Sequence, residues 1–305
     1  MTFDHIFDQL DIRTEPFAIC EIYGSCHVAL KPDAAATLHY ILSGEGQIRM
    51  RERPAIRVAK GSLVLIPSLN SHEVLNDGAL VVPGPSCKPA ALNLARILKS
   101  APDVTSNASR LVALCAHINI GLMGATDVVN LIREPLVTQP ETGNNLQALV
   151  ETLMREICDP RIGSRAFIRA LLLQAVVSMM RDKIAMQDGT MDWMVALRDP
   201  MIWKALSTML DSPGNPYSVE SLADIAGMSR AAFAKRFAEA YGAGPMELLR
   251  SLRIRKASDL LRNTDLPLKR VAETVGFSSR SAFSRAFEAT SGQSPGAFRK
   301  AVRKT

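Results

Sequence analysis

The chain has 305 residues, a length that divides naturally into two domains, each long enough to bury its own core. Its net charge of +6 is uneven, because 17 basic and 9 acidic residues follow from Pro200 onward (+8) while the first 199 residues carry −2. This distribution is typical of a polyanion-binding domain joined to a neutral one. The amino terminus is acidic, and the densest apolar run, from Ala170, is too short for a bilayer span. We therefore expect a cytoplasmic protein without a membrane segment.

Residues 17–82 alternate between apolar and polar side chains in short runs such as "FAICEIYG" and "TLHYILSGEGQIRM", separated by Gly, Pro and Asp. Short β-rich runs with these turn residues predict an antiparallel sandwich or barrel. A stretch of roughly residues 88–109 then interrupts the pattern, and a strand is expected to resume at Leu111.

The β-rich region also contains a surplus of cations. Arg49, Arg53 and Arg57 recur every four residues, a spacing by which some cyclic-dinucleotide binders hold phosphates. Lys88, Arg96 and Lys99 follow in the 88–109 stretch, and insertions at a barrel mouth often carry ligand contacts. One interpretation is a site for an anionic effector that includes Arg49, Arg53, Arg57, Lys88, Arg96 and His39. The competing interpretation is a solvated strand face.

Residues 144–184 predict two long helices, broken at Asp159-Pro160. These helices could pair two copies of the chain or pack within their own domain. A polar stretch at residues 187–189 and the Asp199-Pro200 step mark the boundary to the basic part. We place the domains at residues 1–195 and 196–305.

The basic part repeats one pattern. Ala223, Asp224, Gly227 and Ser229 recur as Ala272, Glu273, Gly276 and Ser278, at an offset of 49. Phe233, Phe237, Gly242 and Pro245 recur as Phe283, Phe287, Gly292 and Pro295, at an offset of 50. The second copy therefore has one extra residue in its turn.

Each copy predicts a helix, a turn and a second helix. In the first copy, Leu222, Ala223, Ile225 and Ala226 form an apolar face, and Gly227 ends the helix in a left-handed conformation. Ser229 is a natural N-cap for the next helix, and Ser278 or Ser279 fills this role in the second copy. The Phe pairs, four residues apart, are expected to be buried, leaving the opposite face of each second helix exposed.

A helix, a Gly-containing turn and a helix with a basic outer face form the helix-turn-helix pattern, whose second helix can enter the major groove of DNA. Residues 245–262 read as a connecting helix that packs on both units. Such a spacer could hold the two recognition helices roughly 34 Å apart, which is one turn of DNA.

Residues 202–302, and above all "VGFSSRSAFSRAFEATSGQSPGAFR", resemble the DNA-binding domain of the AraC/XylS family of bacterial transcription regulators. The resemblance implies promoter DNA as a partner. It places the base-reading positions on Ala231, Ala234 and Lys235 in the first unit and on Arg280, Ser281 and Arg285 in the second. The two alanines are smaller than the side chains often found there, although alanine can contact a thymine methyl group.

The β-rich region resembles the cupin-type sensor domain that precedes the helix-turn-helix pair in many members of this family. The second cupin motif is recognisable in "GSLVLIPSLNSH", with Leu69 where Gly is usual. The first motif retains only His39. Because a catalytic metal in a cupin needs several imidazoles and a carboxylate converging on one point, we expect no metal, no other cofactor and no enzymatic activity.

We therefore predict an α+β protein: a cupin-like β-barrel with a helical dimerisation segment, followed by an all-α domain of two helix-turn-helix units. Its predicted function is that of an effector-responsive transcription activator, with a small molecule such as a cyclic dinucleotide as effector, and the resemblance implies a homodimer.

The residues leave two alternative functions open. Five cysteines without CxxC spacing fit neither a zinc site nor a disulfide framework. However, Cys20 and Cys115 lie on strands that could be neighbours, so their oxidation could remodel the barrel in a redox-sensing regulator. The other alternative is a metal-dependent cupin enzyme joined to a DNA-binding domain.

Overall fold

The computed structural model describes residues 3–8, 10–13, 17–23, 27–30, 35–51, 53–76, 90–91, 110–122, 128–139, 145–187 and 189–303. The chain forms two compact units. The sheet-rich unit consists of Ile12–Ile118 and Glu134–Gln187, and the helical unit of Met1–Asp11, Asn119–Arg133 and Asp188–Thr305.

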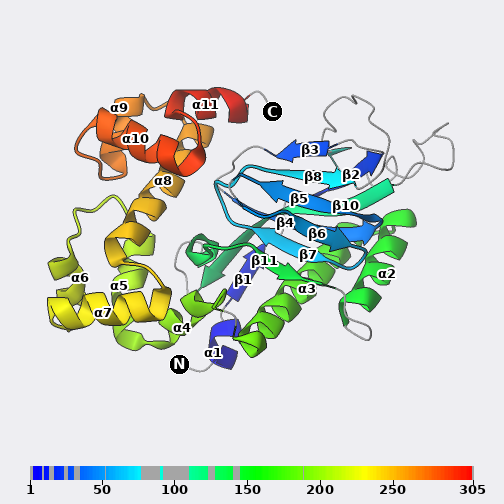
Figure 1. Ribbon diagram of the computed structural model, residues 1–305, viewed down its shortest axis with the longest axis horizontal. Helices are drawn as coiled ribbons and strands as arrows, with labels where there is room; N and C mark the ends of the chain where they lie inside the picture. Colours follow the sequence, from blue (N-terminus) through cyan, green and yellow to red (C-terminus); the bar gives the residue numbers. More distant parts are fainter. Residues whose placement is uncertain are drawn as a thin grey trace. The chain divides into compact units, whose positions relative to one another are not determined.

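The described strands form two antiparallel sheets (Figure 1). Their bounds are β1 Leu10–Arg13, β2 Phe17–Tyr23, β3 His27–Leu30, β4 Ala36–Ser43, β5 Glu45–Met50, β6 Ile56–Ala59, β7 Leu63–Ile66, β8 His72–Asn76, β9 Ala90–Ala91, β10 Arg110–Leu122 and β11 Leu136–Thr138. The larger sheet has the order β11-β7-β4-β10-β2-β9, with β1 also paired to β10, and the smaller has the order β3-β8-β5-β6. The described part therefore has the expected cupin-like, sheet-rich character but consists of two sheets and not of one closed barrel.

The hydrophobic core lies between the two sheets. Ile41 of β4 and Ala113 of β10 contribute from the larger sheet, and Ile48 of β5 and Val74 of β8 from the smaller one. Strand β5 alternates between inward apolar and outward polar residues because only one of its faces is covered.

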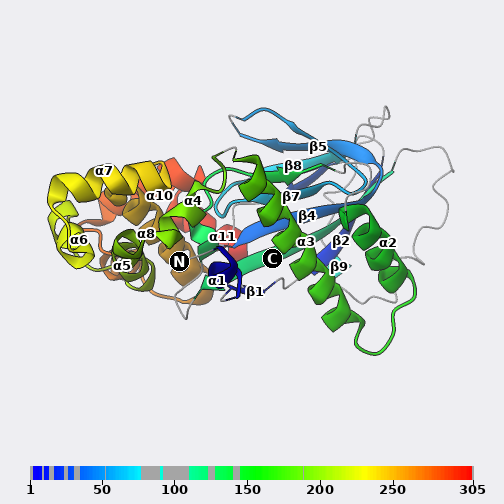
Figure 2. The ribbon, with the colours of Figure 1, turned by 90° about the horizontal axis from the view of Figure 1, so that it is seen from below.

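The second face of the larger sheet is covered by helices. Helix α2 (Asn145–Cys158) packs against β4, and helix α3 (Ser164–Met186) against β11 (Figure 2). The hydroxyl of Tyr40 on β4 donates to the main-chain carbonyl of Leu146 on α2. Because both faces of β4 are covered, its residues from Ala36 to Leu42 are all buried, polar ones included. The two predicted helices are confirmed, with their break at Asp159-Pro160.

The helical unit contains the repeated pattern. Its described helices are α1 Phe3–Asp8, the 3₁₀ helix η1 Val128–Leu131, α4 Asp192–Arg198, α5 Pro200–Asp211, α6 Val219–Ala226, α7 Arg230–Tyr241, α8 Pro245–Asn263, α9 Leu268–Thr274, α10 Arg280–Ser291 and α11 Pro295–Arg303. Helices α6 and α7 form the first predicted helix-turn-helix unit, and α9 and α10 form the second. The domain limits at 195 and 196 stay a prediction.

The turns of the two units differ as the sequence predicts. Gly227 ends α6 with φ 67°, and the Ser229 side chain accepts from the Ala232 main-chain N–H at 3.3 Å. In the second unit the extra residue moves the N-cap to Ser279, which accepts from the Ala282 N–H at 3.2 Å. One expectation was wrong, because Ile225 is 38 % exposed and not part of the buried face of α6.

The connecting helix α8 packs against both helix-turn-helix units: against α7 of the first, and against α9 and α10 of the second. Buried side chains such as Leu252, Ile254 and Leu261 occur along its length. Segment 128–133 also packs in this unit: Arg133 donates to the Gly242 carbonyl at 2.8 Å and pairs with Glu247 at 3.0 Å. The predicted role of 245–262 as a helix that joins the two units is confirmed.

None of the described helices is both long enough and apolar enough to cross a membrane.

The two turn glycines offer a matched test. Both have positive φ, 67° at Gly227 and 81° at Gly276. A Cβ at Gly227 would have no heavy atom within 4 Å, whereas one at Gly276 would lie 2.5 Å from the main-chain oxygen of Gly214. We expect Gly227→Ala to cost about 1 kcal/mol of the free energy of unfolding, from backbone strain. Gly276→Ala should cost at least about 1 kcal/mol more, because its Cβ also overlaps main chain. Denaturant unfolding of the full chain measures both, and equal losses would contradict this account.

Candidate functional site

The second helices of the two units, α7 and α10, each have one apolar and one exposed face. Phe233 and Phe237 of α7 are fully buried, with ring centroids 5.5 Å apart. Phe283 and Phe287 of α10 are also fully buried, with centroids 5.7 Å apart. Because these pairs orient the helices, the opposite residues are directed away from the core.

Four of the six residues assigned to DNA contact lie on those opposite faces, whereas Ala234 lies on the flank of α7 and Arg280 is exposed at the first turn of α10, three residues before Phe283. Five of the six are exposed, and Ala234 is half-buried. The set is Ala231, Ala234 and Lys235 on α7 and Arg280, Ser281 and Arg285 on α10. The side opposite the phenylalanines therefore presents Ala231 and Lys235 on α7 and Ser281 and Arg285 on α10.

The cations of the two faces differ in their ionic partners. Lys235 lies 3.9 Å from Glu239 on the next turn of α7. Arg280 and Arg285 have no ion pair within the described residues. Their charge is therefore available to a phosphate or a guanine, for which arginine offers two parallel N–H donors.

Other cations of the helical unit have internal partners. Arg253 on α8 donates to the main-chain carbonyls of Pro213 at 2.9 Å and Asn215 at 2.8 Å. Arg236 on α7 pairs with Asp199, whose side chain also caps α5. These contacts stabilise the packing of the unit, which makes Arg253 and Arg236 weaker candidates for DNA contact than Arg280 and Arg285.

The residues proposed for an anionic effector lie in different environments. Arg49 on β5 and Arg57 on β6 are exposed on the outer face of the smaller sheet, because their neighbours Ile48 and Val58 face the core. His39, on the larger sheet, is fully buried. Lys88 and Arg96 lie outside the described residues. The structure thus brings Arg49 and Arg57 to one surface but does not bring His39 to it, and the anionic-effector site stays a prediction.

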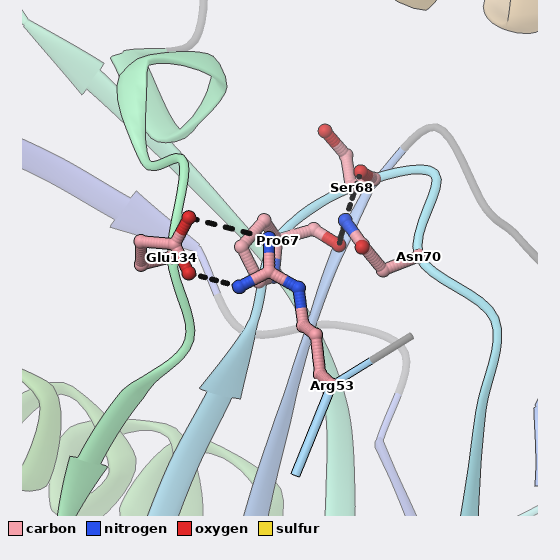
Figure 3. Close-up of polar contacts among 5 residues, drawn as sticks. All are labelled: Arg53, Pro67, Ser68, Asn70 and Glu134. Carbon is pink, nitrogen blue, oxygen red and sulfur yellow. Dashed lines mark hydrogen bonds and ion pairs between the residues drawn. The ribbon is translucent and has the colours of Figure 1, made fainter. Parts of the chain in front are cut away.

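Arg53 is already paired within the sheet-rich unit. Its guanidinium forms a two-pronged ion pair with the carboxylate of Glu134, beside the loop Pro67–Asn70 (Figure 3). An anionic effector would have to compete with this carboxylate.

The loop next to this ion pair contains the position at which the cupin motif of this chain has leucine and not glycine. Leu69, where Gly is usual, has φ 66°. A residue with a Cβ costs about 1–2 kcal/mol in this conformation. The Leu69 side chain is buried, and burying a leucine contributes about 1.5–3 kcal/mol. The Asn70 side chain further holds the loop by donating to the Pro67 and Ser68 carbonyls at 3.2 and 3.1 Å (Figure 3).

A chain of polar side chains crosses the core of the sheet-rich unit. The Nε2 atoms of His39 and His72 lie 2.7 Å apart, and His39 Nδ1 lies 3.1 Å from Cys115 Sγ. His72 Nδ1 lies 3.1 Å from the main-chain oxygen of Asn70. Both imidazoles and both thiols, Cys20 and Cys115, are buried. The sequence analysis assigned His39 to a cupin motif and to the anionic-effector site, and His72 closes the motif "GSLVLIPSLNSH", but no spacing in the sequence could reveal that the two meet across two sheets.

The hydrogen bonds assign a proton to each imidazole. The Asn70 carbonyl can only accept, so His72 Nδ1–H donates to it. Neutral His72 then accepts at Nε2 and His39 Nε2–H donates, which leaves His39 Nδ1 as an acceptor 3.1 Å from the Cys115 sulfur. The result is one continuous donor-to-acceptor chain from His39 to Asn70, with the Cys115 thiol beside its first member.

Burial keeps both imidazoles neutral. Loss of solvation lowers the pKa of His72 to about 4. Burial, and then the charges of His72 and His117, hold the pKa of His39 well below its usual value. Among the described residues, no group of three or more His, Cys, Asp or Glu side chains is arranged to hold a metal ion.

These shifts predict how stability depends on pH. An unfolded His72 binds a proton near pH 6.5, whereas the folded one binds it only near pH 4. As pH falls from 6.5 to 4, the unfolded state takes up a proton that the folded state does not, so His72 alone should cost about 3 kcal/mol of the free energy of unfolding. Unfolding followed over this range should lose part of its pH slope in His72→Gln, with His39 supplying the remainder. An unchanged slope would contradict the assignment.

Comparison with known proteins gives two family matches. Residues 222–301 match a family described as a helix-turn-helix domain, and residues 2–185 match a family described as cupin. The second match spans well over half of the chain.

Several individual proteins are similar to this chain. The HTH-type transcriptional regulator AlkR of Acinetobacter baylyi is 27 % identical over 301 residues, which cover 97 % of each chain. The RCS-specific HTH-type transcriptional activator RclR of Escherichia coli is 27 % identical over 268 residues, which cover 87 % of this chain and 84 % of RclR. Among solved structures, the DNA-binding domain of AdpA in complex with a target DNA is 34 % identical; the match covers 35 % of this chain and 95 % of that one, with a TM-score of 0.34.

Proposed function

The chain belongs to the AraC/XylS family of transcription regulators, with a cupin domain ahead of its helix-turn-helix pair, and we propose that α7 and α10 bind two successive major grooves of promoter DNA. The observation that carries this proposal is the pair of exposed faces opposite the buried Phe pairs. Arg280 and Arg285 supply charge-assisted contacts, and Ala231 and Ala234 allow close approach to the groove floor.

The two recognition helices have unequal roles in this proposal. On α10, two arginines without ionic partners flank Ser281, a set that can read base edges and grip phosphate. On α7, two alanines leave only Lys235, which already lies near Glu239. Sequence selectivity therefore comes mainly from α10, while α7 contributes affinity and shape.

We further propose that the protein activates transcription in the cytoplasm and that the cupin domain receives the signal that controls it. RclR, which is similar along most of its length, is named a transcriptional activator. Buried polar side chains in the core of a cupin domain that shares its chain with a DNA-binding domain support a sensing role for the cupin domain.

The first test is binding to the DNA upstream of the protein's own gene. Replacing Arg280 or Arg285 by Ala should weaken specific binding by about 1–3 kcal/mol, or roughly tenfold or more, because a charged contact is lost. If the lost contact is to phosphate, the slope of log affinity against log salt should also fall by about 1. In vitro transcription from the same DNA should rise with the wild-type protein.

A matched control is Arg161→Ala, which removes the same charge from an exposed arginine in the turn between α2 and α3. It should leave DNA affinity unchanged. Equal effects of Arg161→Ala and Arg285→Ala, or no specific binding by the wild type, would overturn the proposal.

We also propose that the chain forms a homodimer through α3. One side of this helix is buried in its own unit, with Ile168, Leu172 and Val176 among the residues covered. Its other side exposes apolar area, since Phe167 is 47 % and Leu173 39 % exposed. Paired with a second copy, this area would be removed from water.

Charge at this surface should break the dimer. Leu173→Glu is expected to give a monomer in sedimentation analysis, because an exposed position accepts the carboxylate in the folded chain but an apolar interface does not. Gln174→Glu adds the same charge at the neighbouring exposed position and should weaken the dimer less than Leu173→Glu does. A monomeric wild type, or a dimer that tolerates Leu173→Glu, would refute this interface.

A further inference from the structure

The buried chain in the cupin core continues beyond the two histidines to a second thiol. Strands β2 and β10 are antiparallel neighbours, with Cys20 opposite Ala113 and Cys115 opposite Ala18. Cys20 and Cys115 are therefore diagonal neighbours on adjacent strands, with an offset of two residues in the register. Both belong to the core between the sheets. On the other side of β10, Cys115 stands directly opposite His39 of β4. The register thus aligns Cys20, Cys115 and His39 across three adjacent strands.

The two thiols are not equivalent. A hydrogen bond donated by the Cys115 thiol lowers the pKa of Cys20, and the same bond together with burial raises the pKa of Cys115. Cys20 is thus the thiol that more readily becomes a thiolate, which is the nucleophilic form. Cys115 keeps its proton, and the acceptor within reach of it is His39 Nδ1 at 3.1 Å.

We propose that Cys20 and Cys115 form a thiol-oxidation site, in which Cys20 reacts with a small uncharged hydroperoxide, Cys115 closes a disulfide, and His39 takes the proton of Cys115. The size and charge of the oxidant follow from burial, since a bulky or charged one would have to enter the core between two sheets. This inference rests on the proposed function, because it identifies the signal that the cupin domain passes to the DNA-binding domain.

The two steps balance with hydrogen peroxide as the oxidant. The Cys20 thiolate attacks one peroxide oxygen, the O–O bond breaks, and the departing hydroxide becomes water with the proton that Cys20 released. Cys20 is now a sulfenic acid. Cys115 then attacks the Cys20 sulfur while its proton passes to His39 Nδ1, the S–O bond breaks, and the second hydroxide leaves as water with that proton. Two thiols are oxidised to one disulfide, and one peroxide is reduced to two waters.

His72 has a positioning role in the second step. By accepting from His39 Nε2–H at 2.7 Å, it keeps His39 in the form whose Nδ1 is free to accept a proton. When His39 becomes positively charged, its Nε2–H still has this acceptor. The Asn70 carbonyl fixes His72 in turn.

Disulfide formation would also change the sheet. Diagonal residues on antiparallel neighbours have Cα atoms roughly 7–8 Å apart, whereas a disulfide spans at most about 6.8 Å between Cα atoms. Closing the bond must therefore draw β2 and β10 together or alter their twist. Oxidation at this site is consequently coupled to a change in the larger sheet.

The experiment uses the full-length protein with hydrogen peroxide as the probe. Peptide mapping by mass spectrometry should find a Cys20–Cys115 disulfide in the wild type, reversible by dithiothreitol. Cys115→Ser should stop at a Cys20 sulfenic acid that a dimedone probe traps, and Cys20→Ser should give neither product. The control Cys158→Ser removes an exposed thiol on α2 and should leave the disulfide unchanged.

The histidines are tested by the rate of the second step. His39→Asn should slow disulfide closure by about a hundredfold or more, the usual scale for a positioned proton acceptor, and so lengthen the lifetime of the sulfenic acid. The rate of the first step should be unchanged, which separates this role from a general loss of structure. His72→Gln should slow the same step by less.

Operator affinity provides the second readout. Oxidation should change the affinity of the wild type for the DNA upstream of its gene by about fivefold or more and leave Cys20→Ser unaffected. Failure to form the Cys20–Cys115 disulfide, or an unchanged affinity after it forms, would overturn the inference. Failure of the reduced protein to bind specific DNA would instead overturn the proposed function, while peptide mapping would still decide the oxidation site.

Discussion

The burial of two phenylalanines on each recognition helix is the constraint on which DNA binding depends. Phe233 with Phe237, and Phe283 with Phe287, fix the rotation of α7 and α10 about their own axes. Truncation of such a side chain to alanine typically costs about 3–5 kcal/mol, so the rotation is strongly determined. Because these rings are directed inward, Ala231 and Lys235 on α7 and Ser281 and Arg285 on α10 are directed outward.

The core of the sheet-rich unit obeys a different constraint. Two imidazoles and two thiols lie among isoleucines and valines, where an unpaired polar atom would be costly. His39 donates to His72, His72 donates to the Asn70 carbonyl, and the Cys115 thiol lies between Cys20 and His39 Nδ1. Such a hydrogen-bonded network is sensitive to any change in its members. If one group loses its proton or its thiol, the hydrogen bonds of the other groups change as well.

Departures from the family pattern have local physical causes. Leu69 replaces a glycine at a positive φ, and its buried side chain offsets the backbone cost. The extra residue in the second turn shifts the N-cap from the position of Ser278 to Ser279 without disturbing the Phe pair that follows. Arg53, which had seemed available to an effector, is held by Glu134, a residue remote in sequence.

The sequence by itself determined the helical part in detail. Its signals are local: Gly227 and Gly276 at helix ends, serine caps, and Phe pairs four residues apart all act within one or two turns of a helix. It also identified the β-rich region, the break between α2 and α3, and Cys20 and Cys115 on strands that could be neighbours. Only the tertiary structure decided the register that aligns Cys115 with His39, the approach of His72 from the other sheet, and the pairing of Arg53 with Glu134. Strand pairing joins residues far apart along the chain, and a shift of one residue would turn every side chain to the opposite face, so no local pattern could specify these contacts.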